Sequence, residues 1–128
     1  MPKMKQLTVS CENRPGTLAH VAKVLGDVKV NILAFVVGTA GAEGFAQLVV
    51  DNANKAKKAL DRAGLRYTED EVLQVKLANV PGALGHFAAK LAAKDINITS
   101  GYQTTVKGAR QATVVFAVSD LEKAARIR

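Results

Sequence analysis

The sequence predicts an α+β protein in which one module is used twice, and three observations support this. The segment from Asn13 to Ile32 returns 66 residues later as Asn79 to Ile98, and nine of the 20 aligned positions are identical. Each copy alternates between the hydrophobic spacing of strands and that of helices. Glycine, proline and asparagine, which favour turns, lie between the expected strands and helices.

The first copy predicts the element order β-α-β-β-α-β. Asp51 and Asn52 can cap its second helix, and Gly64 suits the end of that helix. This order is typical of the ferredoxin-like module, a four-stranded antiparallel sheet with two helices on one face. Strands and helices are expected at residues 6–10, 18–28, 30–38, 45–50, 53–63 and 65–68.

The second copy follows the charged residues Glu69-Asp70-Glu71, which we take as a break between two strands. Its elements are expected at residues 72–77, 84–91, 96–105 and 111–118, with a capped helix from Leu121. The remaining residues leave no room for a last strand. We therefore expect two tandem modules, 1–70 and 71–128, of which the second lacks its last strand. The unpaired sheet edge should recruit another chain, unless the natural C-terminus is missing here.

Composition sets limits on function. A content of 48% hydrophobic and 23% charged residues is typical of a globular protein. The N-terminal segment has no apolar targeting core, so a cytoplasmic location is expected. One cysteine excludes an internal disulfide and a cysteine-based metal cluster. The net charge of +7 favours anionic partners, but many basic residues fall on predicted helices and suit solvated helix faces.

The repeated loop Asn-x-Pro-Gly lies between a strand and a helix in both copies. The first N–H groups of that helix have no partner within the helix, and a carboxylate is a natural ligand there. Gly16 and Gly82 allow close approach to the backbone, and the asparagines supply donors and acceptors. Asparagine also caps helices and fills turns, so the loop is either a repeated site or a repeated structural device.

Two segments resemble the ACT domain: Cys11-Glu12-Asn13-Arg14-Pro15-Gly16-Thr17-Leu18 followed by Val30-Asn31-Ile32, and Asn79-Val80-Pro81-Gly82-Ala83-Leu84 followed by Ile96-Asn97-Ile98. The resemblance covers nearly the whole chain as a tandem pair. It implies a non-catalytic sensor that binds an amino acid between modules and regulates amino-acid metabolism. No catalytic domain is attached, so the chain resembles free-standing tandem ACT proteins, and no cofactor or metal is implied.

The resemblance also implies which residues bind the ligand. In the serine-sensing version, modules pair through their second strands, and each site joins a loop asparagine to a second-strand asparagine. We therefore expect Asn13 to act with Asn97, and Asn79 with Asn31, by pairing of the two copies within one chain. The expected ligand-binding residues are Cys11, Asn13, Pro15, Gly16, Thr17, Leu18, Asn31 and Ile32 in the first copy, and Asn79, Pro81, Gly82, Ala83, Leu84, Asn97 and Ile98 in the second.

Two departures from that pattern matter for specificity. A histidine two residues before the loop asparagine is replaced by Cys11 in the first copy and by Leu77 in the second. Both replacements lose a polar contact, so serine is not an assured ligand and the second copy is expected to be the weaker sensor.

His20 and His86 lack carboxylate or thiolate companions and suit structural roles on the helices.

Other functions remain open at this point. The incomplete second module and its open sheet edge also make the chain a candidate regulatory subunit that docks on a biosynthetic enzyme of the acetolactate synthase type, with ligand binding secondary. A homodimer or a partner enzyme is expected in either case. RNA-binding domains share the element order, but with 5% aromatic residues a stacking platform is missing. We find no acid, base or nucleophile constellation for an enzyme, and no membrane partner is expected.

Overall fold

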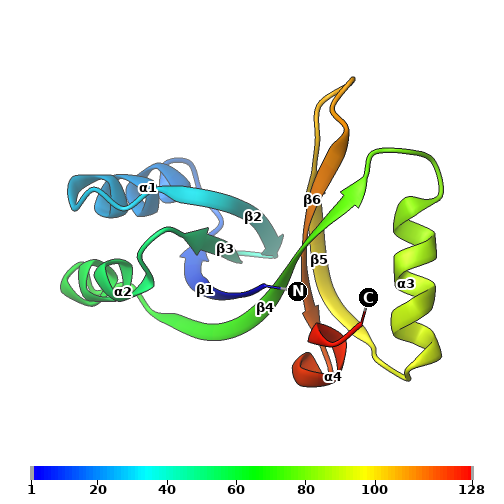
Figure 1. Ribbon diagram of the computed structural model, residues 1–128. Coiled ribbons are helices and arrows are strands. Elements are labelled where there is room, and N and C mark those ends of the chain that lie inside the picture. Colours follow the sequence, from blue (N-terminus) through cyan, green and yellow to red (C-terminus); the bar gives the residue numbers. More distant parts are fainter. Residues whose placement is uncertain (1, 128) are drawn as a thin grey trace. The chain divides into compact units, whose positions relative to one another are not determined.

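A computed structural model describes residues 2–127, which form six strands and four helices (Figure 1). The chain divides into two compact units. The N-terminal unit is Lys5–Asp70, and the C-terminal unit is Met1–Met4 together with Glu71–Arg128. The elements are β1 (Lys3–Glu12), α1 (Thr17–Asp27), β2 (Ile32–Ala40), β3 (Glu43–Val50), α2 (Ala53–Arg62), β4 (Tyr67–Ala78), α3 (Ala83–Ala93), β5 (Ile98–Thr104), β6 (Gln111–Val118) and α4 (Leu121–Ala125).

The sheet of the N-terminal unit has the strand order β2-β3-β1-β4. β3 pairs antiparallel with both β1 and β2, so Leu48 lies opposite Leu7 on one side and Phe35 on the other. This order is that of a ferredoxin-like module, as the sequence predicts. β2 is an edge strand, and β4 lies beside β1.

Two helices cover one face of the N-terminal sheet and lie side by side (Figure 1). α1 buries Val21 and Leu25, and α2 buries Ala56, Ala59 and Leu60, because these residues recur at helical spacing. Alternate residues of β1 and β3 complete the core from the sheet. The buried cluster consists of Leu7, Val9, Val21, Leu25, Val30, Ala46, Leu48, Val50, Ala56 and Leu60.

The C-terminal unit repeats this plan in the order β5-β6-β4. Val75 of β4 lies opposite Val114 of β6, which brings their side chains onto the same face. α3 packs on this face through Phe87 and Leu91. The Phe87 ring stacks on that of Phe116, with ring centroids 5.6 Å apart.

β4 corrects one expectation from the sequence. The acidic residues at positions 69–71 do not break the chain into two strands, since β4 runs without interruption from Tyr67 to Ala78. Acidic side chains are tolerated at solvent-facing positions of a strand, and Glu69 is compensated by an ion pair in which its Oε2 lies 3.0 Å from Lys57 Nζ. The first residues of β4 therefore close the N-terminal sheet, and its later residues open the C-terminal one.

The edge of the C-terminal sheet requires a second correction. The second module has no last strand of its own after α4, as expected, but its edge is not left unpaired at Gln74. Residues 2–4 belong to this unit, and the Gln74 N–H donates to the Pro2 carbonyl over 3.1 Å. Lys3 also forms an ion pair with Glu122 of α4. The first residues of β1 thus lie beside β4, at the position where we expected another chain.

Candidate functional site

The loop before α1 places a left-handed glycine at the start of the helix. Gly16 is the N-cap residue of α1 with φ of 89°, and no side chain caps the helix end. Pro15 precedes the N-cap and so lies outside the helix. By contrast, α2 is capped by Asn52, whose Oδ1 accepts from the Lys55 N–H over 3.1 Å. The amino end of α1 therefore keeps N–H groups that no side chain satisfies.

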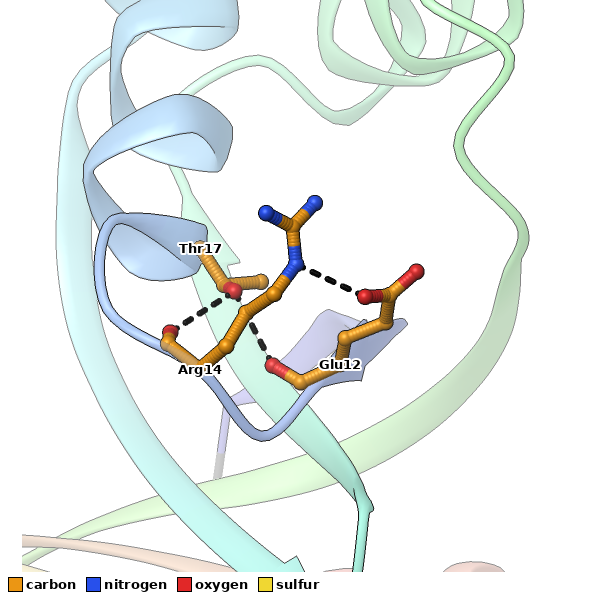
Figure 2. Close-up of polar contacts among 3 residues, drawn as sticks. All are labelled: Glu12, Arg14 and Thr17. Atoms are coloured by element: carbon orange, nitrogen blue, oxygen red, sulfur yellow. Dashed lines mark hydrogen bonds and ion pairs between the residues drawn. The ribbon is translucent and has the colours of Figure 1, made fainter.

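Three residues fix the shape of this loop (Figure 2). The Thr17 hydroxyl lies 2.9 Å from the Glu12 carbonyl and 3.0 Å from the Arg14 carbonyl, so its single proton is shared between them. Arg14 Nε donates to Glu12 Oε2 over 2.7 Å. The Thr17 hydroxyl is thus engaged in holding the loop, while the outer nitrogens of Arg14 point away from Glu12 (Figure 2).

Asn13 ties the loop to the β2–β3 hairpin. Its Nδ2 donates to the Gly41 carbonyl over 2.8 Å, and its backbone N–H donates to the Ala42 carbonyl over 2.8 Å. These bonds orient the amide and use one of its side-chain hydrogens. Among residues 2–127, its Oδ1 has no hydrogen-bond partner, so an acceptor is left for a ligand.

A hollow of about 220 Å³ opens between this loop, α1 and the hairpin. It is lined by five of the predicted site residues: Cys11, Asn13, Gly16, Thr17 and Leu18. It is also lined by residues that sequence reasoning missed, which are Glu12, Arg14, Ala19, Val37, Gly38, Thr39, Gly44, Phe45 and Ala46. Pro15 faces a neighbouring hollow on the other side of the loop with His20 and Leu65.

Two glycines of the β2–β3 hairpin are a sequence signal for the part of the site that was missed. A Cβ on Gly38 would lie 2.5 Å from Cζ of Phe45, so only glycine allows the ring to lie against β2. A Cβ on Gly44 would lie 2.9 Å from the Gly38 carbonyl. Glycine within a strand marks such a close approach. Gly38 closes the strand expected at residues 30–38 and Gly44 precedes the one expected at 45–50, so the sequence contained this signal.

Cys11 borders the hollow as a protonated thiol. Its Sγ donates to the Val9 carbonyl over 3.5 Å, and burial raises the pKa of the thiol. A raised pKa lowers the fraction of the reactive thiolate. Cys11 therefore contributes a small polarizable surface to the hollow rather than a nucleophile.

Asn31 and Ile32 lie at the opposite end of the same sheet from Asn13. The Asn31 N–H donates to Asp51 Oδ1 over 2.9 Å, next to the end of β3. The loop hollow lies at the start of β3, about 23 Å away at roughly 3.3 Å per strand residue. The structure thus does not bring Asn31 to Asn13 within the unit.

The C-terminal unit repeats the geometry of the loop. Asn79 Nδ2 donates to the Ala109 carbonyl over 2.9 Å, and Gly82 begins α3 with φ of 89° and no side-chain cap. Pro81 and Ala83 flank Gly82. Arg14 is replaced by the exposed Val80. The polar surroundings of the first loop are therefore lost here.

The remaining predicted residues of this unit are divided between two places. Leu84 and Ile98 line an apolar hollow of about 430 Å³ between α3 and β5. Asn97 lies at the far end of the sheet, where its N–H donates to Ser119 Oγ over 2.9 Å. As in the first unit, the loop asparagine and the second-strand asparagine lie at opposite ends of one sheet.

Residues 2–127 contain no group of three or more His, Cys, Asp or Glu side chains placed to hold a metal ion. Both histidines are exposed on their helices. None of the helices in the described part of the chain has the length and apolar character to span a bilayer.

Comparison with known proteins identifies the family. A family model described as an ACT domain pair matches residues 2–127. Comparison with curated protein sequences gave no match. Among solved structures, protein BT0572 from Bacteroides thetaiotaomicron is 28% identical, with 96% of this chain and 84% of that chain covered and a TM-score of 0.90.

Two similar structures carry a functional description. The regulatory subunit of aspartate kinase from Thermus thermophilus, in a ligand-free form, is 18% identical, with 97% and 88% coverage and a TM-score of 0.72. The corresponding subunit from Thermus flavus is 17% identical, with 89% and 82% coverage and a TM-score of 0.68. At this identity the similarity establishes the fold. Together with the family match over residues 2–127, it shows that the chain belongs to the ACT domain family as a tandem pair.

Proposed function

We propose that this protein is a non-catalytic sensor that binds an amino acid in the hollow beside Asn13 and thereby regulates an enzyme of amino-acid metabolism. The observation that carries the proposal is the contrast between helix ends. α1 begins at Gly16 without a side-chain cap and faces a hollow, whereas α2 is capped by Asn52. A carboxylate is well suited to such an uncapped end.

The hollow offers a complementary group for each part of an amino acid. The N–H groups at the start of α1 can receive the carboxylate, and the outer nitrogens of Arg14 add positive charge nearby. Asn13 Oδ1 can accept from the ammonium group, since Gly41 already fixes the orientation of the amide. Leu18 and Val37 supply apolar surface for a side chain. A volume of about 220 Å³ favours a small metabolite over a drug-sized ligand, which needs roughly 300 Å³ or more.

The residues of the loop around Asn79 favour weaker ligand binding in the C-terminal unit. Leu77 stands where the first copy has Cys11, and Val80 stands where it has Arg14. The loop around Asn79 also borders none of the larger hollows of its unit described above. We therefore propose that the N-terminal unit carries the main site, which Asn97 of another module completes as the family resemblance implies.

Regulation of a partner enzyme is the second part of the proposal. The similar Thermus structures are described as regulatory subunits of aspartate kinase, which supports a role as a subunit that docks on a biosynthetic enzyme. Binding between modules would change how they pack and so change the activity of that enzyme. Copurification of an enzyme from the native host, with and without the ligand, tests this part separately.

A thermal-shift screen of the twenty amino acids tests ligand binding. A ligand at about 100 times its dissociation constant should stabilise the protein by about 2.7 kcal/mol. The change Asn13→Ala should reduce the shift strongly, while Asn79→Ala, which removes the corresponding bond in the other unit, should reduce it little. Calorimetric titration of both variants gives the affinities. Equal binding by wild type and Asn13→Ala would contradict the proposed site.

A further inference from the structure

The C-terminal unit has a hollow whose lining carries several positive charges. The hollow has a volume of about 520 Å³ and lies between α3 and α4. Among residues 2–127 it is lined by four basic residues and two apolar ones, which are Lys90, Lys94, Lys123, Arg126, Ala93 and Ile127. No acidic residue is among them. The basic residues come from both helices, so positive charge borders the hollow on two sides.

The repeat shows that the two lysines of α3 take positions that are apolar in the N-terminal unit. Lys90 and Lys94 correspond to Val24 and Val28, which lie 66 positions earlier. Both valines are half-buried and pack against the core of their unit. The side of α3 that carries Lys90 and Lys94 is thus the side that α1 uses for packing. These lysines are therefore not explained as part of an ordinary solvated helix face.

The second helix of each unit begins in the same way. Asp120 caps α4 as Asn52 caps α2, because each side chain accepts from the N–H three residues later, over 3.0 and 3.1 Å. With these caps aligned, Ile127 corresponds to the buried Ala59. α1 packs against α2 in the N-terminal unit. The equivalent space between α3 and α4 stays open as the hollow.

Three of the cations at this hollow have no carboxylate partner in the described part of the chain. No ion pair between residues 2–127 involves Lys94, Lys123 or Arg126. Glu122, the acidic neighbour of Lys123, pairs with Lys3 instead. Like charges around one hollow repel each other, and an anion bound there would relieve this repulsion.

The helix dipole explains part of this pattern but not all of it. A positive side chain near the last turn of a helix interacts favourably with the dipole, and Lys90 lies in the last turn of α3. This effect acts on each helix separately and does not select a side of the helix. It therefore does not account for basic residues of two helices at one hollow, or for lysine in place of Val24 and Val28.

We propose that this hollow binds a small anion that carries two or more phosphate groups. Phosphate oxygens accept several charge-assisted hydrogen bonds at once, and lysine and arginine commonly supply them. The volume of about 520 Å³ lies within the range of roughly 300–1,000 Å³ that small-molecule sites occupy. An acidic polypeptide spreads its carboxylates along a backbone, whereas the cations here meet at one hollow, which favours a compact anion. The site does not involve Asn13, so the proposal does not rest on the proposed function.

Calorimetric titration of the full chain with inorganic triphosphate, orthophosphate and hexaglutamate tests the proposal. The ionic strength is about 0.15 M, at which exposed charges more than about 8 Å apart are largely screened. Triphosphate should bind at one site and about tenfold or more tightly than orthophosphate, because it reaches cations on both helices. No binding of triphosphate, or equally tight binding of orthophosphate, would overturn the proposal. Tighter binding of hexaglutamate would make an acidic polypeptide the occupant and would also overturn it.

A pair of matched double variants tests the location by charge. Lys94→Gln/Arg126→Gln removes one exposed charge from each side of the hollow and should weaken triphosphate binding about tenfold or more. Lys55→Gln/Lys58→Gln removes the same net charge from exposed positions of α2 and should bind like wild type. Equal weakening by both variants would show diffuse attraction to a basic surface and would refute the site. All four side chains are exposed, so both variants should keep the circular dichroism spectrum of wild type.

Amide chemical shifts of the wild-type chain locate the anion without any substitution. Triphosphate should shift the signals of residues 90–94 and 121–127 and leave those at the start of α1 unchanged. Shifts confined to residues 16–18 would place the anion at the uncapped end of α1 and would contradict the proposal. The thermal-shift screen with amino acids reports separately on the hollow of the N-terminal unit, so either proposal can fail while the other holds.

Discussion

Replacing Gly16 by alanine should destabilise the N-terminal unit, although the added methyl group would meet no other atom. A Cβ at Gly16 has nothing within 4 Å, so no steric clash with a neighbour is expected. The cost comes from the backbone, because φ is +89° and left-handed conformations cost other residues about 1–2 kcal/mol. Alanine also lowers the conformational entropy of the unfolded chain, and this offsets about 0.4–1 kcal/mol of the backbone cost. We expect a net loss of about 1 kcal/mol in the free energy of unfolding.

Gly26 provides the matched control in the same helix. It lies inside α1 without a positive φ, and a Cβ there also has nothing within 4 Å. Gly26→Ala should therefore stabilise the unit by about 0.5–1 kcal/mol. Urea unfolding followed by circular dichroism measures both variants, and their midpoints should move in opposite directions with similar slopes. If Gly16→Ala proves as stable as wild type, the assignment of strain to this position is wrong.

Three further predictions concern the N-terminal unit. Asn52→Ala removes the α2 cap and should lower the unfolding free energy by about 1 kcal/mol, as measured by urea unfolding; no loss would contradict the cap. The Lys57 ammonium holds the pKa of Glu69 below its ordinary value, so this pair stabilises the fold above that ordinary pKa and its contribution is lost as pH falls through the lowered value. Lys57→Met should flatten the pH dependence of stability in that window, and an unchanged profile would refute the coupling. Because burial raises the pKa of Cys11, a thiol reagent at pH 8 should modify it more slowly in folded than in urea-unfolded protein, and equal rates would contradict this.

Local signals allowed much of the fold to be predicted from sequence. Asn52 caps α2 and Gly64 takes a positive φ of 71° after it, because both features depend on a few neighbouring residues. The break expected at residues 69–71 was wrong because charge alone does not end a strand. Lys57 neutralises part of that charge from another element, and sequence spacing gives no sign of this.

The pairing of residues 2–4 with β4 was beyond local reasoning. Pro2 and Gln74 are 72 positions apart, and neither carries a motif that would select the other. The second copy was correctly expected to lack a last strand of its own. Which segment takes that place depends on the tertiary arrangement of the unit rather than on any pattern in the second copy.

Five of the fourteen residues that line the hollow were expected from the sequence, because the repeat marks the loop but not the hairpin. Asn13 and Asn79 are 66 positions apart, whereas the carbonyls that they bind, those of Gly41 and Ala109, are 68 apart. The hairpins therefore differ in length by two residues, and the alignment that revealed the loops does not extend through them. Phe45 of the first hairpin has Thr113 at the corresponding place, so its part in the hollow could not be found by comparing the copies.

The contacts of residues 2–4 with β4 and α4 have a consequence for biosynthesis. These residues are translated well before their partner Gln74 and the ion-pair partner Glu122. The N-terminal unit can fold while the rest of the chain is still being made, since domains generally fold as units during translation. Residues 2–4 then lack both partners until Gln74 and, later, Glu122 have been translated. An affinity tag fused directly before these residues would accordingly disturb the C-terminal unit rather than the N-terminal unit, which follows the tag directly in sequence.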